Sequence, residues 1–487
     1  MICSGARPRS FSLTAGISDA VLQASAGQLA RAIAAGALSS VEIVRTFLDR
    51  IEAVNPALNA VVQMTAEAAL EQARAADVQR AQGALLGPLH GVPFTAKDAL
   101  DTAGVVTACG VPGRAAWVPH RDATAVARLR AAGAILLGKT NLPALCSTFE
   151  CANEVYGRTN NPYDLARSPG GSSGGEAAII AAAGSPLGLG SDAGGSIRMP
   201  CHYCGIAGLK PTAGRVPSTG HFPANIGWPV RGEIGPMARS VADLRLALGV
   251  IAGPDGSDVA VPPVSVDPFL AAAEDLRIAY YADNGQWAAD DDTRAILHQA
   301  VSLLRERGAA VTEERPAPVP EAMELFARGR PKVAAVLDLL PELLEAGEWD
   351  LETMQGRSGE WLQRARRLDQ SQLRSEIEYF VWAAKLDLFR QGMLAFGQRY
   401  DAVLCPVSAR PALEHGFAAD PDRAGAFNFT NAYNLAGWPA VTLRCGTSSE
   451  GLPIGLQVAA GPWREEVALG IAQVLEKALG GWQPPPI

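Results

Sequence analysis

The sequence predicts an α/β protein built on a wound β-sheet, and three observations carry this prediction. Short apolar stretches of strand length alternate with helical patterns along most of the chain. Hydrophobic residues make up 48% of the 487 residues and charged residues only 19%, which is enough apolar material for a large buried core. Gly (50) and Pro (34) are abundant without a repeat, as expected for many tight turns.

The first ninety residues have helical patterns. Ser39 and Glu42 form a capping box, because the serine can cap the first turn and the glutamate can reach back to it. Ile43 and Phe47 follow at helical spacing, and Pro56 is expected to end this helix.

Strands and helices alternate after this point, and the pattern weakens beyond residue 255. A buried strand is expected to end at Lys97, and the next helix is expected to have Asp122 as its N-cap and to close at Gly133. The strands are expected over 92–96, 134–137, 187–191, 277–281, 402–405, 440–444 and 454–459, and further helices over 176–183 and 292–307.

Residues 320–400 differ from the rest, because they are helical, charged and rich in aromatic residues of exposed type. These aromatic residues are Trp349, Trp361, Tyr379, Phe380 and Trp382. We interpret the segment as a helical cap or insertion between α/β core segments 25–315 and 401–475. No repeat or low-complexity linker marks a boundary, so residues 1–487 are expected to form a single domain.

The formal net charge of −8 is scattered along the chain, which argues against a nucleic-acid partner. No apolar stretch is long enough for a signal peptide or a membrane span, so the expected location is cytoplasmic. The eight cysteines are ordinary for this length, and disulfides are not expected in a reducing compartment.

Two regular motifs are weak on physical grounds. Gly133 to Thr140 matches the phosphate-loop pattern GxxxxGK[ST]. A helix precedes Gly133, however, and the four spacer residues are apolar strand formers, so nucleotide binding is kept only as an alternative of a different class. Cys201 and Cys204 form a CxxC with no second ligand pair, so no metal is expected there. None of the six histidines accompanies a Gly-x-Ser-x-Gly nucleophile elbow.

A third constellation is chemically coherent. Lys97 ends a predicted strand, Ser172 lies between two Gly-Gly pairs, and Ser196 follows Asp192-Ala-Gly-Gly. A serine needs a base to become a nucleophile, and without histidine a neutral lysine can serve. The pKa of an ordinary lysine is about 10.4, so burial away from carboxylates must favour the neutral amine. Glycine-flanked N–H groups can hold the oxyanion of a tetrahedral intermediate.

These segments resemble the amidase signature family. The resemblance rests on Ser168-Pro-Gly-Gly-Ser-Ser-Gly-Gly175, Gly190-Ser-Asp-Ala-Gly-Gly-Ser-Ile-Arg198 and Cys204-Gly-Ile-Ala-Gly-Leu-Lys-Pro-Thr212, with Gly91-Val-Pro-Phe-Thr-Ala-Lys-Asp98 upstream and Gly235-Pro-Met-Ala-Arg-Ser240 downstream. It spans about residues 25–475 and weakens over 320–400. It implies a single large α/β domain with a mixed, twisted central sheet covered by helices.

The resemblance also implies site residues. Lys97 would be the base, Ser172, in a cis peptide, would relay the proton, and Ser196 would attack the acyl carbon. The implied oxyanion hole consists of the N–H groups of Ala193, Gly194, Gly195 and Ser196. The implied supporting residues are Ser173, Asp192 and Arg198, and the expected substrate contacts are Cys146, Phe149, Gly171 and Cys201.

The expected function is hydrolysis of linear amide C–N bonds, with esters and carbamates (urethanes) as further substrates and no metal or cofactor. The 146–153 segment resembles the acyl-pocket stretch of fatty-acid amide hydrolases and aryl acylamidases, which favours a hydrophobic or aryl amide. The alternative within the family is a glutamine-dependent amidotransferase subunit, which would need partner subunits. Otherwise the expected partner is a small-molecule substrate, and the expected assembly is a monomer or homodimer.

Overall fold

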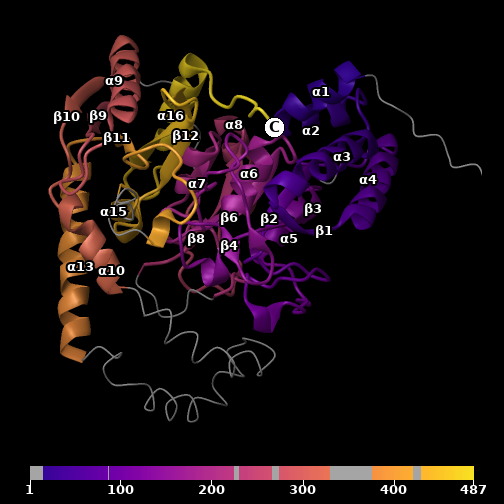
Figure 1. Ribbon diagram of the computed structural model, residues 1–487, viewed down its shortest axis with the longest axis horizontal. Helices are drawn as coiled ribbons and strands as arrows, with labels where there is room; N and C mark the ends of the chain where they lie inside the picture. Colours follow the sequence, from indigo (N-terminus) through magenta and orange to yellow (C-terminus); the bar gives the residue numbers. More distant parts are fainter. Residues whose placement is uncertain (1–14, 86, 224–229, 266–273, 330–375, 420–428) are drawn as a thin grey trace, which may run out of the picture.

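The computed structural model describes residues 15–85, 87–223, 230–265, 274–329, 376–419 and 429–487, and a mixed β-sheet lies at its centre (Figure 1). The described part of this sheet has eleven strands in the order β1-β3-β2-β6-β8-β7-β12-β13-β11-β9-β10. Their bounds are β1 Val61–Met64, β2 Pro93–Lys97, β3 Ile135–Thr140, β6 Leu187–Asp192, β7 Ala207–Lys210, β8 Glu233–Ala238, β9 Arg277–Tyr280, β10 Ala310–Glu313, β11 Ala402–Pro406, β12 Ala440–Thr447 and β13 Pro453–Ala460. The short strands β4 (Ala152–Asn153) and β5 (Gly157–Arg158) pair separately.

Parallel pairing brings two strand ends together. Strand β2 is parallel to both β3 and β6, whereas β6 through β11 are joined by antiparallel pairs. Because β2 and β6 run side by side in the same direction, Lys97 and Asp192 end their strands at the same edge of the sheet. The catalytic segments expected from the sequence therefore meet there.

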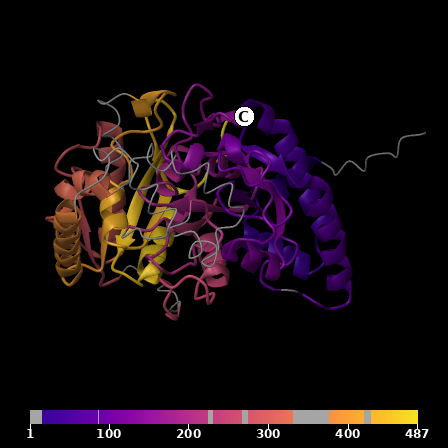
Figure 2. The ribbon, with the colours of Figure 1, turned by 90° about the horizontal axis from the view of Figure 1, so that it is seen from below.

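Helices cover the sheet and extend to both ends of the molecule. Figures 1 and 2 both place the N-terminal helices α1 to α4 at one end and α13 at the other. The helices are α1 Ala15–Gln23, α2 Ala26–Ala34, α3 Ser40–Leu58, α4 Ala66–Ala81, α5 Thr124–Ala131, α6 Gly174–Ala181, α7 Arg198–Tyr203, α8 Val241–Ile251, α9 Asp291–Glu306, α10 Ala322–Gly329, α13 Glu376–Gly397, α15 Asn431–Leu435 and α16 Glu465–Leu479. Every residue of α6 and α7 is buried, so these two helices lie inside the fold.

The structure confirms the predicted fold class, with differences at particular residues. The capping box of Ser39 and Glu42 is present at the start of α3. The prediction that Pro56 ends this helix was wrong, because α3 continues to Leu58 and ends at Asn59 in the left-handed conformation. The prediction that Asp122 caps α5 was also wrong, because the N-cap of this helix is Ala123. The Asp122 carboxylate instead accepts a hydrogen bond from the Ala103 N–H.

The described helices of the 320–400 segment belong to the core. Helices α10 and α13 pack with β11 and α15 in a second hydrophobic cluster, where Phe326, Trp382 and Met393 are buried. The Trp382 indole donates to the Leu325 carbonyl at 2.9 Å, whereas Tyr379 and Phe380 are exposed. These two helices therefore pack against the sheet rather than standing apart from it. The predicted helical region over 330–375, with Trp349 and Trp361, lies outside the described residues. Over the part that the structure describes, no helix has both the length and the apolar character needed to cross a membrane.

We expect Gly175→Ala to destabilise the fold, because α6 packs too closely for a methyl group. An added Cβ would lie 2.5 Å from the Asn141 nitrogen and 2.7 Å from the Ala60 oxygen, both backbone atoms. Overpacking of this kind costs about 1–3 kcal/mol. Gly249→Ala in α8 is the matched control: its Cβ would meet nothing within 4 Å, so the variant should gain roughly 0.5–1 kcal/mol. Calorimetric midpoints that fall equally for both variants would contradict this packing.

Candidate active site

Lys97 is a buried amine at the end of β2 whose contacts are hydroxyl groups. Its Nζ lies 2.6 Å from Ser172 Oγ and 3.1 Å from Ser191 Oγ, and the side chain has no exposed surface. Within the described residues no carboxylate lies at ion-pair distance from it.

The Ser172 loop is held against the end of β6. The Gly171–Ser172 peptide is cis, as the family resemblance implied. The neighbouring Ser173 links three segments: its Oγ and the Ser191 N–H are 3.3 Å apart, its hydroxyl faces the Ser191 carbonyl at 3.3 Å, and its N–H donates to the Ser196 carbonyl at 3.0 Å. Ser173 therefore keeps the two serine loops side by side.

Ser196 lies in a turn that only glycine allows. Gly195 has a φ of +131°, and a Cβ on it would lie 2.5 Å from Thr430 Oγ1. A Cβ on Gly194 would lie 2.6 Å from the Phe326 ring. The Gly195 N–H donates to Asp192 Oδ1 at 2.7 Å, so it is occupied by the carboxylate rather than open for an oxyanion. The Gly195 N–H was expected in the oxyanion hole, but the structure leaves this residue only the role of giving the turn its backbone conformation.

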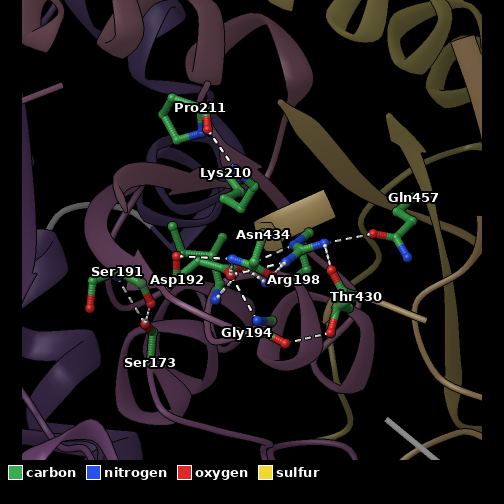
Figure 3. A network of polar contacts seen from close by, with 12 residues as sticks. Ser173, Ser191, Asp192, Gly194, Arg198, Lys210, Pro211, Thr430, Asn434 and Gln457 are labelled. Atoms are coloured by element: carbon green, nitrogen blue, oxygen red, sulfur yellow. Dashed lines mark hydrogen bonds and ion pairs between the residues drawn. The ribbon is translucent and has the colours of Figure 1, made fainter. Parts of the chain in front are cut away.

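A buried ion pair supports this turn (Figure 3). Arg198 Nε lies 2.9 Å from Asp192 Oδ2, and Arg198 Nη2 lies 3.0 Å from Asp192 Oδ1. Arg198 Nη1 donates to the Thr430 carbonyl at 3.0 Å and to Gln457 Oε1 at 2.9 Å, and Nη2 also donates to Asn434 Oδ1. Figure 3 shows these residues converging on Asp192 and Arg198 from the C-terminal segments.

The electrostatics of Asp192 follow from these contacts. Burial alone would raise the pKa of Asp192, but the charge of Arg198 and hydrogen bonds from Arg198 and Asn434 outweigh it and hold the pKa well below its usual range. The carboxylate is therefore ionised, and it orients the turn through the N–H groups of Gly195 and Ile197.

Thr148 and Phe149 of the 146–153 segment lie directly on the Ser172 loop. A Cβ on Gly171 would lie 2.6 Å from the Phe149 carbonyl carbon, so this segment covers the loop closely. The thiol of Cys146 is hydrogen-bonded to Cys109 and also faces Lys97 and His221.

Cys201 does not face the site. Its side chain has no exposed surface and packs in the main core beside Ile197 and Gly208, because α7 turns it toward β7. Burial raises the pKa of its thiol well above the ordinary value. Over the described residues, no group of three or more histidine, cysteine or acidic side chains could hold a metal ion.

The phosphate-loop match is a strand of the sheet. Residues 135–140 form β3, and Lys139 is fully buried with its Nζ 3.0 Å from Thr107 Oγ1 and 3.7 Å from Asp98 Oδ1. A bound phosphate could not reach this amine, so the nucleotide-binding alternative was wrong.

Two residues at the site escaped the sequence analysis. Ser191 Oγ contacts Lys97, and His221 Nε2 lies 2.9 Å from the same Ser191 oxygen. Neither residue carries a motif of its own. Only their places in the sequence could have indicated a role at the site. Ser191 immediately precedes Asp192, and His221 follows Gly220 in a turn.

Comparisons with known proteins show which family and fold the chain resembles. A family profile described as Amidase matches residues 42–469. The chain is 36% identical to a glutamyl-tRNA(Gln) amidotransferase subunit from Moorella thermoacetica (strain ATCC 39073 / JCM 9320), over 91% of this chain and 93% of that protein. It is 34% identical to an acylamidase of Rhodococcus erythropolis, over 93% and 94%. The solved structure of 6-aminohexanoate cyclic dimer hydrolase with its substrate superposes with a TM-score of 0.81 at 28% identity, over 96% of this chain and 99% of that one.

We expect Asp192→Asn to destabilise the protein strongly, because it leaves the Arg198 guanidinium buried without a counter-ion. Breaking a buried pair in this way costs about 3–5 kcal/mol. The control is Asp291→Asn, which breaks a pair with Arg294 in which the Asp291 side chain is 97% exposed, and the expected cost is below about 1 kcal/mol. Thermal midpoints measured side by side test this. Similar small shifts in both variants would show that the buried pair does not hold the turn.

Proposed function

The chain belongs to the amidase family, whose members act on C–N bonds, and on that premise we propose that it hydrolyses amides with Ser196 as its nucleophile. The observation that carries this proposal is the 2.6 Å contact between the buried Lys97 amine and Ser172. A neutral amine in that position can accept a proton from the hydroxyl.

The proposed relay moves one proton in each direction. Ser196 gives its proton to Ser172, Ser172 gives its own to Lys97, and the Ser196 oxygen bonds to the acyl carbon. When the C–N bond breaks, Ser172 returns a proton to the leaving amine and receives one from Lys97. Water then hydrolyses the acyl-enzyme by the same route. The bond from the Ser173 N–H to the Ser196 carbonyl supports this, because it keeps the two loops adjacent.

We assign the oxyanion hole to the N–H groups of Ala193, Gly194 and Ser196. Preorganised backbone donors are often the largest single contribution to such catalysis. Two hydrogen bonds fix the turn that carries these groups. The Gly195 N–H donates to Asp192 Oδ1, and Thr430 Oγ1 donates to the Gly194 carbonyl at 2.5 Å. This rigidity supports the assignment.

The preferred substrate is proposed to be a hydrophobic or aryl amide, with esters and carbamates also cleaved. Aromatic residues border both catalytic loops: the Phe326 ring lies against Gly194, and Phe149 packs beside the apolar cluster of Met199, Tyr203 and Phe417. An apolar acyl or amine group would be desolvated favourably in these surroundings.

A second candidate is the amidotransferase function named for the Moorella relative, which the 36% identity over almost the whole chain favours. In that case the protein would release ammonia from glutamine and depend on partner subunits. The two candidates share the proposed chemistry and differ in substrate and in the need for a partner.

We expect the three proposed catalytic residues to be essential for turnover. Ser196→Ala should lower kcat by up to about 10⁶-fold, and Lys97→Ala and Ser172→Ala by about 10²- to 10⁴-fold. Ser449→Ala, at an exposed serine, should leave the rate unchanged. Hydrolysis rates with a chromogenic anilide test this, and near-normal turnover by Ser196→Ala would refute the assignment.

We expect the isolated chain to favour apolar amides over glutamine. Each added buried methylene should raise kcat/KM about fourfold, since its burial contributes about 0.8 kcal/mol. The measurement is kcat/KM over a panel of short amides, long-chain amides, anilides, carbamates and glutamine. Glutaminase activity that appears only with a copurified partner, and no cleavage of anilides, would instead support the amidotransferase.

A further inference from the structure

The second contact of Lys97 leads away from the nucleophile along a line of buried hydrogen bonds. Lys97 Nζ lies 3.1 Å from Ser191 Oγ, and Ser191 Oγ lies 2.9 Å from His221 Nε2. His221 Nδ1 lies 2.9 Å from the Pro223 carbonyl oxygen. The proton relay proposed above uses none of these groups beyond Lys97.

His221 is held in this position by its own segment. The Phe222 N–H donates to the Ala99 carbonyl at 2.8 Å, and the Asp101 N–H donates to the Gly220 carbonyl at 2.8 Å. Residues 99–101 follow β2 directly, so this pairing fixes the histidine beside the end of the strand that carries Lys97. Gly220 has a φ of +82°, and its Cβ would lie 2.5 Å from Ala123 Cα.

The Pro223 carbonyl determines which atom donates in each hydrogen bond between His221, Ser191 and Lys97. A carbonyl oxygen only accepts, so His221 Nδ1 must carry the hydrogen. In the neutral ring Nε2 is then an acceptor, and it takes the Ser191 O–H. The Ser191 oxygen is thereby free to accept an N–H from Lys97. The Lys97 lone pair is left for the remaining partner, the Ser172 hydroxyl.

We propose that Ser191 and His221 are positioning residues that aim the lone pair of Lys97 at Ser172, and that turnover requires His221 in its neutral form. This inference rests on the proposed role of Lys97 as the base. With the ring protonated, Nε2 would donate to Ser191. The Ser191 O–H would then turn to the Lys97 lone pair, which is the acceptor that the Ser172 proton needs.

Several titratable or charged groups face His221 from the surrounding elements. Lys97 lies beyond Ser191, Cys146 approaches from the turn over 144–146, and Asp101 lies after β2. Arg114 is 3.5 Å from Asp101 and stacks over the Phe222 ring at 3.9 Å.

The test compares His221→Gln with His221→Leu in the full chain. Glutamine can present an acceptor to Ser191 but does not titrate, whereas leucine removes the acceptor. We expect His221→Gln to keep alkaline kcat within about threefold of wild type and to lose one of two ionisations on the acid limb of kcat/KM. We expect His221→Leu to lower kcat by roughly 10- to 100-fold at every pH, with KM nearly unchanged.

Two variants of Ser191 test the same inference, and this test does not require that the His221 variants fold. Ser191→Thr keeps the hydroxyl and should retain most of the activity, whereas Ser191→Ala should lose as much kcat as His221→Leu. Thermal midpoints are recorded for all four variants, and only variants within a few degrees of wild type are compared.

Three outcomes would overturn the inference. One is wild-type kcat in both Ser191→Ala and His221→Leu while Lys97→Ala is inactive. Another is an unchanged acid limb in His221→Gln. The third is loss of that ionisation in Cys146→Ala instead, which would assign it to the thiol. Full activity of Lys97→Ala is a different result, because it would reject the proposed function itself.

Discussion

The buried pair of Asp192 and Arg198 is the constraint on which the rest of the site depends. All five N–H donors of the Arg198 guanidinium have an acceptor, from Asp192, Asn434, Thr430 and Gln457. A buried charge pair is tolerated only when its remaining donors and acceptors are satisfied in this way. Thr430, Asn434 and Gln457 lie more than 230 residues after Arg198 in the chain, so the support of the turn that carries Ser196 comes from residues distant in sequence.

Two buried lysines on neighbouring strands, Lys139 and Lys97, differ in the groups that their amines contact. Lys139 on β3 pairs in register with Ala96, immediately before Lys97 on β2, and neither lysine has exposed surface. Lys139 has a carboxylate, Asp98, at 3.7 Å and donates to the Thr107 hydroxyl. Burial lowers the pKa of Lys139, and the charge of Asp98 opposes this shift. Over the described residues, the hydrogen bonds of the Lys97 amine are to the hydroxyl groups of Ser172 and Ser191, and no carboxylate lies at ion-pair distance from it. In our proposal, the hydrogen bonds from Lys97 through Ser191 to His221 aim the lone pair of the Lys97 amine at the Ser172 hydroxyl.

Much of the site could be predicted from the sequence, because its parts are local. The end of a buried strand at Lys97 and the glycine-flanked serines are readable without a structure, and parallel pairing of β2 and β6 then brings them together. Strand β8 could not be predicted, since Gly235 and Pro236 interrupt its apolar pattern. His221 was missed because its place depends on long-range pairing with residues 99–101. Cys201 was misplaced because nearness in sequence to Ser196 says nothing of the direction in which α7 turns its side chain.

We propose that Ser196 is the nucleophile and that Lys97 activates it. The most direct measurement is labelling with a fluorophosphonate, followed by mass spectrometry of the digested protein and by the rate of label incorporation. We expect one equivalent of label on Ser196, no label in Ser196→Ala, and incorporation slowed by about 10²-fold or more in Lys97→Ala. Label on another residue, or incorporation at the wild-type rate without the Lys97 amine, would contradict it.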